Sequence, residues 1–111
     1  MTNPGACTKM DTMDPIEFRE SLSRGTPPAK IGKLLEALWH EARGDWDRAH
    51  EIAQSQKGRT AAAVHAYLHR KEGDLANADY WYERAERART RGALEKEWQA
   101  LVAELLESGK E

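Results

Sequence analysis

The chain contains one phrase twice, and the spacing of the two copies limits the folds open to it. The first copy covers residues 38–49 (LWHEARGDWDRA) and the second covers residues 67–78 (YLHRKEGDLANA), an offset of 29 residues. In each copy, helix-forming residues lead into a Gly-Asp pair and a second helical stretch follows. Glycine can adopt the left-handed conformation that ends a helix, and aspartate can cap the next helix. Each copy therefore predicts a helix, a tight turn and another helix.

A repeated helix pair of this length is typical of folds in which each unit packs on the next, since neither unit can bury its apolar face alone. We predict an all-α domain over residues 14–108, with repeat 1 over about residues 27–57 and repeat 2 over about residues 58–91. A short helix should begin at Asp14 and Pro15. The first repeat helix should start after Thr26-Pro27-Pro28, and the last repeat helix should reach Arg89.

The two ends of the chain have different patterns. An apolar stripe with a charged opposite face predicts a capping helix over about residues 93–107, and residues 1–13 are polar and predict a flexible arm. This arm contains Cys7, the one cysteine, which has no partner for an internal disulfide and favours a reducing compartment. Because no signal peptide or membrane-spanning run is visible, we expect a cytoplasmic protein that does not bind membranes.

The charge of the chain argues against nucleic acid as a partner. The net charge of −2 arises from 17 basic and 19 acidic side chains that are mixed along the sequence. A binding surface for nucleic acid needs clustered positive charge, and the arginines of residues 84–91 are interleaved with Glu83 and Glu86. We interpret them as cations that offset the dipole of a helix end.

The residues after the two turns resemble the tetratricopeptide repeat family. The second copy is the better match, with Gly73, Ala78, Tyr82 and Ala85 at the family's spacing. The first copy is more divergent, and the offset of 29 residues is shorter than the family's repeat of about 34 residues. The layout is also similar to that of a group of small bacterial proteins of unknown activity. The resemblance implies antiparallel helix pairs, here two divergent repeats between a short N-terminal helix and a C-terminal capping helix.

The resemblance also implies a protein-binding scaffold, in which the first helix of each pair lines a concave face. The strip of residues implied for this face is mostly apolar and comprises Ile31, Leu34, Leu38, Glu41, Ala63, Tyr67 and Arg70. An apolar strip has to be covered. The N-terminal helix around Phe18 and Leu22, a second copy of the chain or an amphipathic helix of a protein partner would each serve.

Histidines supply a second candidate site. His65 and His69 are four residues apart, so they share one face of a helix, and two imidazoles at this spacing can bind a metal ion. His40 and Glu36 occupy the equivalent positions of the first repeat. A metal set would therefore comprise Glu36, His40, His65 and His69, whereas the alternative is that these histidines only pack between helices.

Motifs typical of catalysis or of cofactor binding are absent from the sequence. It contains no nucleophile elbow, no phosphate-binding glycine loop and no CxxC or HExxH pattern. We therefore expect a protein without enzymatic activity or cofactor, which binds a protein, a peptide or a second copy of itself through the concave strip. A metal or small ligand bound at the histidines is the alternative.

Overall fold

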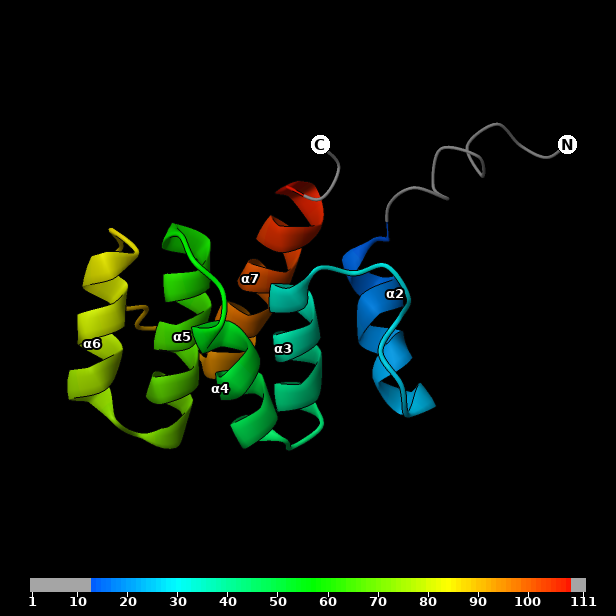
Figure 1. Ribbon diagram of the computed structural model, residues 1–111, viewed down its shortest axis with the longest axis horizontal. Coiled ribbons are helices and arrows are strands. Elements are labelled where there is room, and N and C mark those ends of the chain that lie inside the picture. Colours follow the sequence, from blue (N-terminus) through cyan, green and yellow to red (C-terminus); the bar gives the residue numbers. More distant parts are fainter. Residues whose placement is uncertain (1–12, 109–111) are drawn as a thin grey trace, which may run out of the picture.

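The computed structural model describes residues 13–108, and this part of the chain holds six α-helices, one short 3-10 helix and no strand (Figure 1). The elements in chain order are α2 (Pro15–Glu20), η1 (Ser21–Arg24), α3 (Lys33–Ala42), α4 (Trp46–Gln54), α5 (Arg59–Glu72), α6 (Leu75–Arg84) and α7 (Leu94–Ser108). The predicted all-α fold is confirmed for these residues. None of these helices is both long and apolar enough to span a bilayer. The predicted N-terminal arm, with Cys7, lies outside the described residues except for Met13.

The two Gly-Asp turns have the same local structure, as the repeated phrase predicts. Gly44 and Gly73 both have a φ of +94°, a left-handed conformation that side chains disfavour. The carboxylate of Asp45 accepts a hydrogen bond from the backbone N–H of Arg48, and Asp74 repeats this contact at the start of α6. Each aspartate satisfies one of the free N–H groups of a helix start. The turns therefore reverse the chain and cap the next helix in one step.

Two of the predicted helix ends are wrong. Helix α3 begins at Lys33 and not after Pro28, because Lys30 has a φ of 65° and Gly32 is extended. Helix α6 ends at Arg84, five residues before the predicted end, because Glu86 has a φ of 62° and terminates the helix. The arginines beyond Arg84 therefore lie outside the last helical turn, and the dipole interpretation fails for them. Two of them form ion pairs instead, Arg87 with Glu104 and Arg89 with Asp79.

The helices α3, α4, α5 and α6 pack in chain order, each on the next, and stand side by side in Figure 1. Short turns make α3 antiparallel to α4 and α5 antiparallel to α6. Their apolar faces form one main core, in which Leu38, Val64 and Leu68 are completely buried. A second, smaller cluster between α5 and α6 contains Ala66, Ala78 and Tyr82. Alanines at these contacts let the helix backbones approach closely.

Helix α7 crosses behind this row and packs on α3, α5 and α2 (Figure 1). It buries Trp98, Leu101 and Val102 on the predicted apolar stripe. The indole N–H of Trp98 donates a hydrogen bond to the backbone oxygen of Leu38 at 3.1 Å, and its ring lies 5.9 Å from that of Phe18. The C-terminal helix therefore closes the main core by covering the first helices of both pairs.

Candidate functional site

The structure places the predicted concave strip under α7. Leu38, Glu41, Ala63 and Tyr67 are buried, while Ile31, Leu34 and Arg70 are half-buried. The cover that the apolar strip requires is thus a helix of the same chain, and it is the C-terminal helix and not the N-terminal helix alone. The four buried side chains are inaccessible to a protein partner in this conformation.

The polar members of the strip are bonded within the protein. The Glu41 carboxylate accepts hydrogen bonds from the Tyr67 hydroxyl, at 3.1 Å, and from the Lys71 ammonium. Burial raises the pKa of Tyr67 well above its usual range, and the neighbouring Glu41 raises it further. Tyr67 therefore stays a neutral donor at every physiological pH. These groups anchor α3 to α5.

A similar group anchors α7. Arg70 donates to the Glu97 carboxylate at 2.8 Å, and the hydroxyl of Tyr82 donates to the other oxygen of Glu97 at 2.5 Å. Burial and this hydrogen bond raise the pKa of Tyr82. Separating Glu97 from Arg70 would leave a buried charge unpaired, which is costly. These contacts therefore fix the position of α7.

The four residues of the predicted metal set do not converge. Glu36 and His40 pair with each other on α3, with 3.8 Å between Nε2 of His40 and the Glu36 carboxylate. His65 and His69 lie together on α5, where they belong to a different group. Neither Glu36 nor His40 lies with the two histidines of α5 in a group whose ligand atoms could share one ion. A four-ligand site is therefore not formed.

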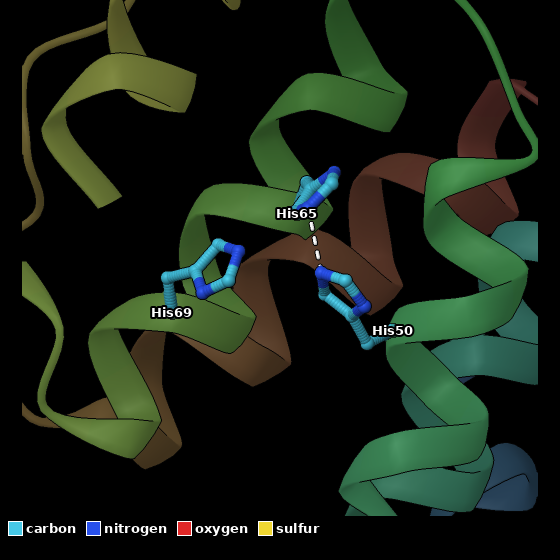
Figure 2. Close-up of side chains that lie close together, drawn as sticks. All are labelled: His50, His65 and His69. Carbon is cyan, nitrogen blue, oxygen red and sulfur yellow. Dashed lines mark hydrogen bonds between the residues drawn. The ribbon is translucent and has the colours of Figure 1, made fainter. Parts of the chain in front are cut away.

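His65 and His69 are joined by a third histidine, His50 of α4 (Figure 2). One ring nitrogen from each of the three histidines lies within 4.8 Å of the others. The Nε2 atoms of His50 and His65 are 3.0 Å apart, so one ring donates a hydrogen bond to the other. The ring centre of His69 lies 5.0 Å from the ring centre of each of the other two histidines. We call these three residues the histidine cluster.

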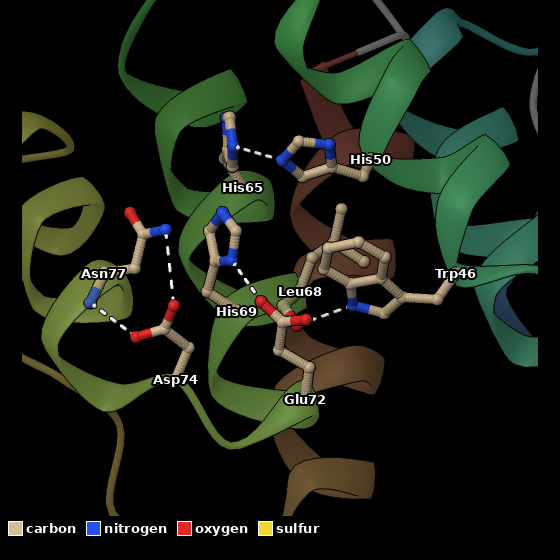
Figure 3. A network of polar contacts seen from close by, with 8 residues as sticks. All are labelled: Trp46, His50, His65, Leu68, His69, Glu72, Asp74 and Asn77. Atoms are coloured by element: carbon tan, nitrogen blue, oxygen red, sulfur yellow. Dashed lines mark hydrogen bonds and ion pairs between the residues drawn. The ribbon is translucent and has the colours of Figure 1, made fainter.

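Two tryptophans enclose the histidine cluster. Trp46 of α4 stacks on His50 with ring centres 4.9 Å apart, and Trp81 of α6 stacks on His65 at 3.9 Å. Trp46 is itself fixed, since its indole N–H donates to the backbone oxygen of Leu68 at 2.7 Å (Figure 3). The cluster therefore lies between α4, α5 and α6, with aromatic rings on two sides.

A carboxylate orients the third imidazole. The Nδ1 atom of His69 lies 2.7 Å from the carboxylate of Glu72, and its other ring nitrogen points toward His65 (Figure 3). A carboxylate at this position holds the proton on Nδ1 and leaves Nε2 with a free lone pair. The same arrangement is common for histidines that bind metal ions.

Two of the three imidazoles, those of His50 and His65, are held in their neutral form. Burial lowers the pKa of His65 to about 4, and repulsion by His50 and His69 adds to this effect. Burial also lowers the pKa of His50, with a further decrease from His69 that Glu72 and Asp47 partly oppose. His50 and His65 are therefore unprotonated at neutral pH, the state that a metal ion requires of an imidazole.

Comparison with known proteins adds no assignment. No protein-family model, curated protein or solved structure matches the chain. The function has to be inferred from the residues of the site.

The residues of the cluster fit a transition-metal ion. A tetrahedral ion with metal–nitrogen bonds of about 2.0–2.1 Å places its nitrogen ligands about 3.3 Å apart. The nitrogens of the cluster lie within 4.8 Å of one another, so small side-chain rotations bring them to this spacing. Imidazole nitrogen is a good ligand for zinc, nickel and copper and a poor one for calcium or magnesium. Divalent transition ions are therefore the chemical class that the site selects.

Sequence reasoning missed His50, although a signal for it exists. His50 is four residues after Trp46, an apolar residue, so the two residues share one face of α4. It also lies four residues before the end of α4, and His65 lies six residues after the start of α5. Antiparallel helices joined by a short turn bring such residues to similar heights.

Proposed function

We propose that this protein binds one divalent transition-metal ion through His50, His65 and His69. The observation that carries the proposal is the convergence of three ring nitrogens from α4 and α5 within 4.8 Å. The carboxylate of Glu72 supports it by orienting His69, and the neutral state of His50 and His65 reduces competition from protons at pH 7.

The position of the cluster suggests what binding does for the fold. We interpret α3–α4 and α5–α6 as two divergent repeats of the tetratricopeptide type, and His50 belongs to the first pair whereas His65 and His69 belong to the second. A bound ion would therefore link the two pairs across their junction. Binding to the folded state alone also raises its stability.

Protein binding through the concave strip is the weaker proposal. Leu38 and Tyr67 are 0% and 2% exposed, so a partner could reach them only after α7 had left. That step would expose Trp98 and its neighbours to water, at a cost of about 25 cal/mol for each Å² of apolar surface. The histidine cluster needs no such rearrangement.

Equilibrium dialysis of protein without an affinity tag tests the metal proposal. After treatment with a chelator, the wild type should bind one Zn²⁺ or Ni²⁺ per chain, and His65→Ala should lose this site. His40→Ala is the matched control, because it removes the equivalent imidazole of the other pair, whose partner is Glu36. Absence of saturable binding, or equal losses in both variants, would contradict the proposal.

A further inference from the structure

The histidine cluster supplies three nitrogen ligands, and two carboxylates near it have other partners. Glu72 is bonded to Nδ1 of His69, and Asp74 caps α6 by accepting from the backbone N–H of Asn77. Among residues 13–108, no fourth histidine, cysteine or carboxylate completes the group. A tetrahedral ion bound here would therefore have one position without a ligand from this part of the protein.

This side of the molecule has room for a small molecule. A groove of about 670 Å³ is lined by His65, a member of the cluster, and by Trp81, which stacks on it. Alanines of α4 and α5 form part of its surface. Its charged lining residues are three cations and two carboxylates: Lys57, Arg59, Arg84, Glu83 and Glu86. His50, on the other side of the cluster, is only half-buried. The cluster is thus next to solvent and next to a groove.

The charges favour an anion. An imidazole ligand brings no negative charge to a divalent ion, and among residues 13–108 no carboxylate or thiolate joins the three histidines as a fourth ligand. On the rim of the groove, Arg59 is paired with Glu86, while the guanidinium of Arg84 lies over the rings of Tyr80 and Trp81. Arg84 donates one hydrogen bond to the Tyr80 hydroxyl, at 3.4 Å, and its guanidinium has further N–H donors that suit a carboxylate.

We propose that the metal ion of the histidine cluster keeps a fourth coordination position for a ligand from solution. Water occupies this position and is exchanged for small anions, above all for carboxylate molecules that bind in the groove. This inference rests on the proposed metal binding. The exchange needs no redox step, because the anion replaces the water molecule at the metal and the oxidation state is unchanged. A water molecule bound at such a site is also more acidic than free water, as in zinc sites with three protein ligands.

Cobalt is the probe for this inference, since the visible spectrum of Co²⁺ reports its ligands. The full chain is loaded with Co²⁺, and azide, acetate or benzoate is then added. The expected result is a saturable change of the d–d bands for each anion. Arg84→Ala should weaken benzoate several-fold and leave azide unchanged, while the control Arg24→Ala, a change on the exposed end of η1, should alter neither.

Three results separate the inference from the metal proposal. Co²⁺ binding with a spectrum that no anion changes would overturn the inference and leave the metal site in place. A thiolate charge-transfer band that disappears in Cys7→Ser would also overturn it, because the fourth ligand would then come from the chain. Failure of the wild type to bind Co²⁺, Zn²⁺ or Ni²⁺ would overturn both.

Discussion

Helices α3 and α5 carry polar residues at equivalent positions, but only α5 builds a site. On α3 the equivalent residues are Glu36 and His40, which are half-exposed and 3.8 Å apart. On α5 they are His65 and His69, which are 4% and 6% exposed and lie against His50. The two equivalent positions of the repeated sequence therefore hold a half-exposed pair on α3 and two buried members of the cluster on α5.

The difference comes from what precedes each helix. Helix α5 packs on α4, which supplies His50 and Trp46. The residue 29 positions before His50 is Ser21 of η1, a buried hydroxyl that accepts a hydrogen bond from the indole N–H of Trp39. Ser21 is thus bonded to Trp39, and this position adds no imidazole to the pair on α3. The lesson is that a site in stacked helix pairs depends on the neighbour as much as on its own helix.

The largest effect should be seen in the pH dependence of the metal-free protein. The pKa of His65 is about 4 in the folded state and about 6.5 in the unfolded state, so the unfolded state binds a proton first as the pH falls. The stability that neutral His65 contributes is complete above pH 6.5 and is lost toward pH 4, by about 3 kcal/mol. Urea unfolding at several pH values, with a chelator present, measures this slope.

Two variants give that measurement its controls. His65→Asn should flatten the slope between pH 6.5 and pH 4, whereas His40→Asn should keep it. Comparing differences between variants also removes the common titration of the carboxylates. Equal slopes for the wild type and His65→Asn would show that the burial of this imidazole has no effect on its protonation.

The next effect concerns the residue that orients the cluster. Glu72→Gln should lower the affinity for Zn²⁺ by about 10–100-fold, because the amide no longer holds the His69 proton as a carboxylate does. Glu36→Gln is the matched control, since it neutralises the carboxylate beside the histidine of α3, and it should leave the affinity unchanged. Competition with a coloured chelator measures both constants. A Glu72 variant with the affinity of the wild type would mean that His69 binds no ion.

Sequence reasoning recovered the local structure better than the site. The period of the apolar residues and the Gly-Asp turns predict helices and reversals, because both are properties of neighbouring residues. The stripe of α7 shows only that one face is buried and not which surface covers it, so Leu38 and Tyr67 were expected to be accessible. The metal set failed for a related reason. The predicted set was based on equivalent positions of the repeated sequence, such as Glu36 and His65. The third histidine of the cluster, His50, comes instead from the contact between α4 and α5.

A smaller effect concerns the two Gly-Asp turns, the feature that the two helix pairs share. Gly44→Ala and Gly73→Ala should each destabilise the protein by about 1 kcal/mol, because both glycines have a φ of +94° that a side chain disfavours. The added methyl group meets no atom within 4 Å at either position, so the conformation alone determines the cost. Chemical denaturation measures both values. A difference well above the error of the method would show that the turns are not equivalent.

The smallest effect should come from the pair on α3, and it decides whether that pair is a site in its own right. Glu36 and His40 lie 3.8 Å apart, and their side chains are 22% and 19% exposed. A pair of this kind on one helix contributes about 0.3–0.5 kcal/mol and is weakened by salt. A double-mutant cycle with Glu36→Gln and His40→Gln, at low and high salt, measures the coupling. A coupling energy above about 1 kcal/mol, insensitive to salt, would be the behaviour of a desolvated pair. In that case α3 would resemble α5 after all, and the contrast between the two helices would lie only in the missing third imidazole.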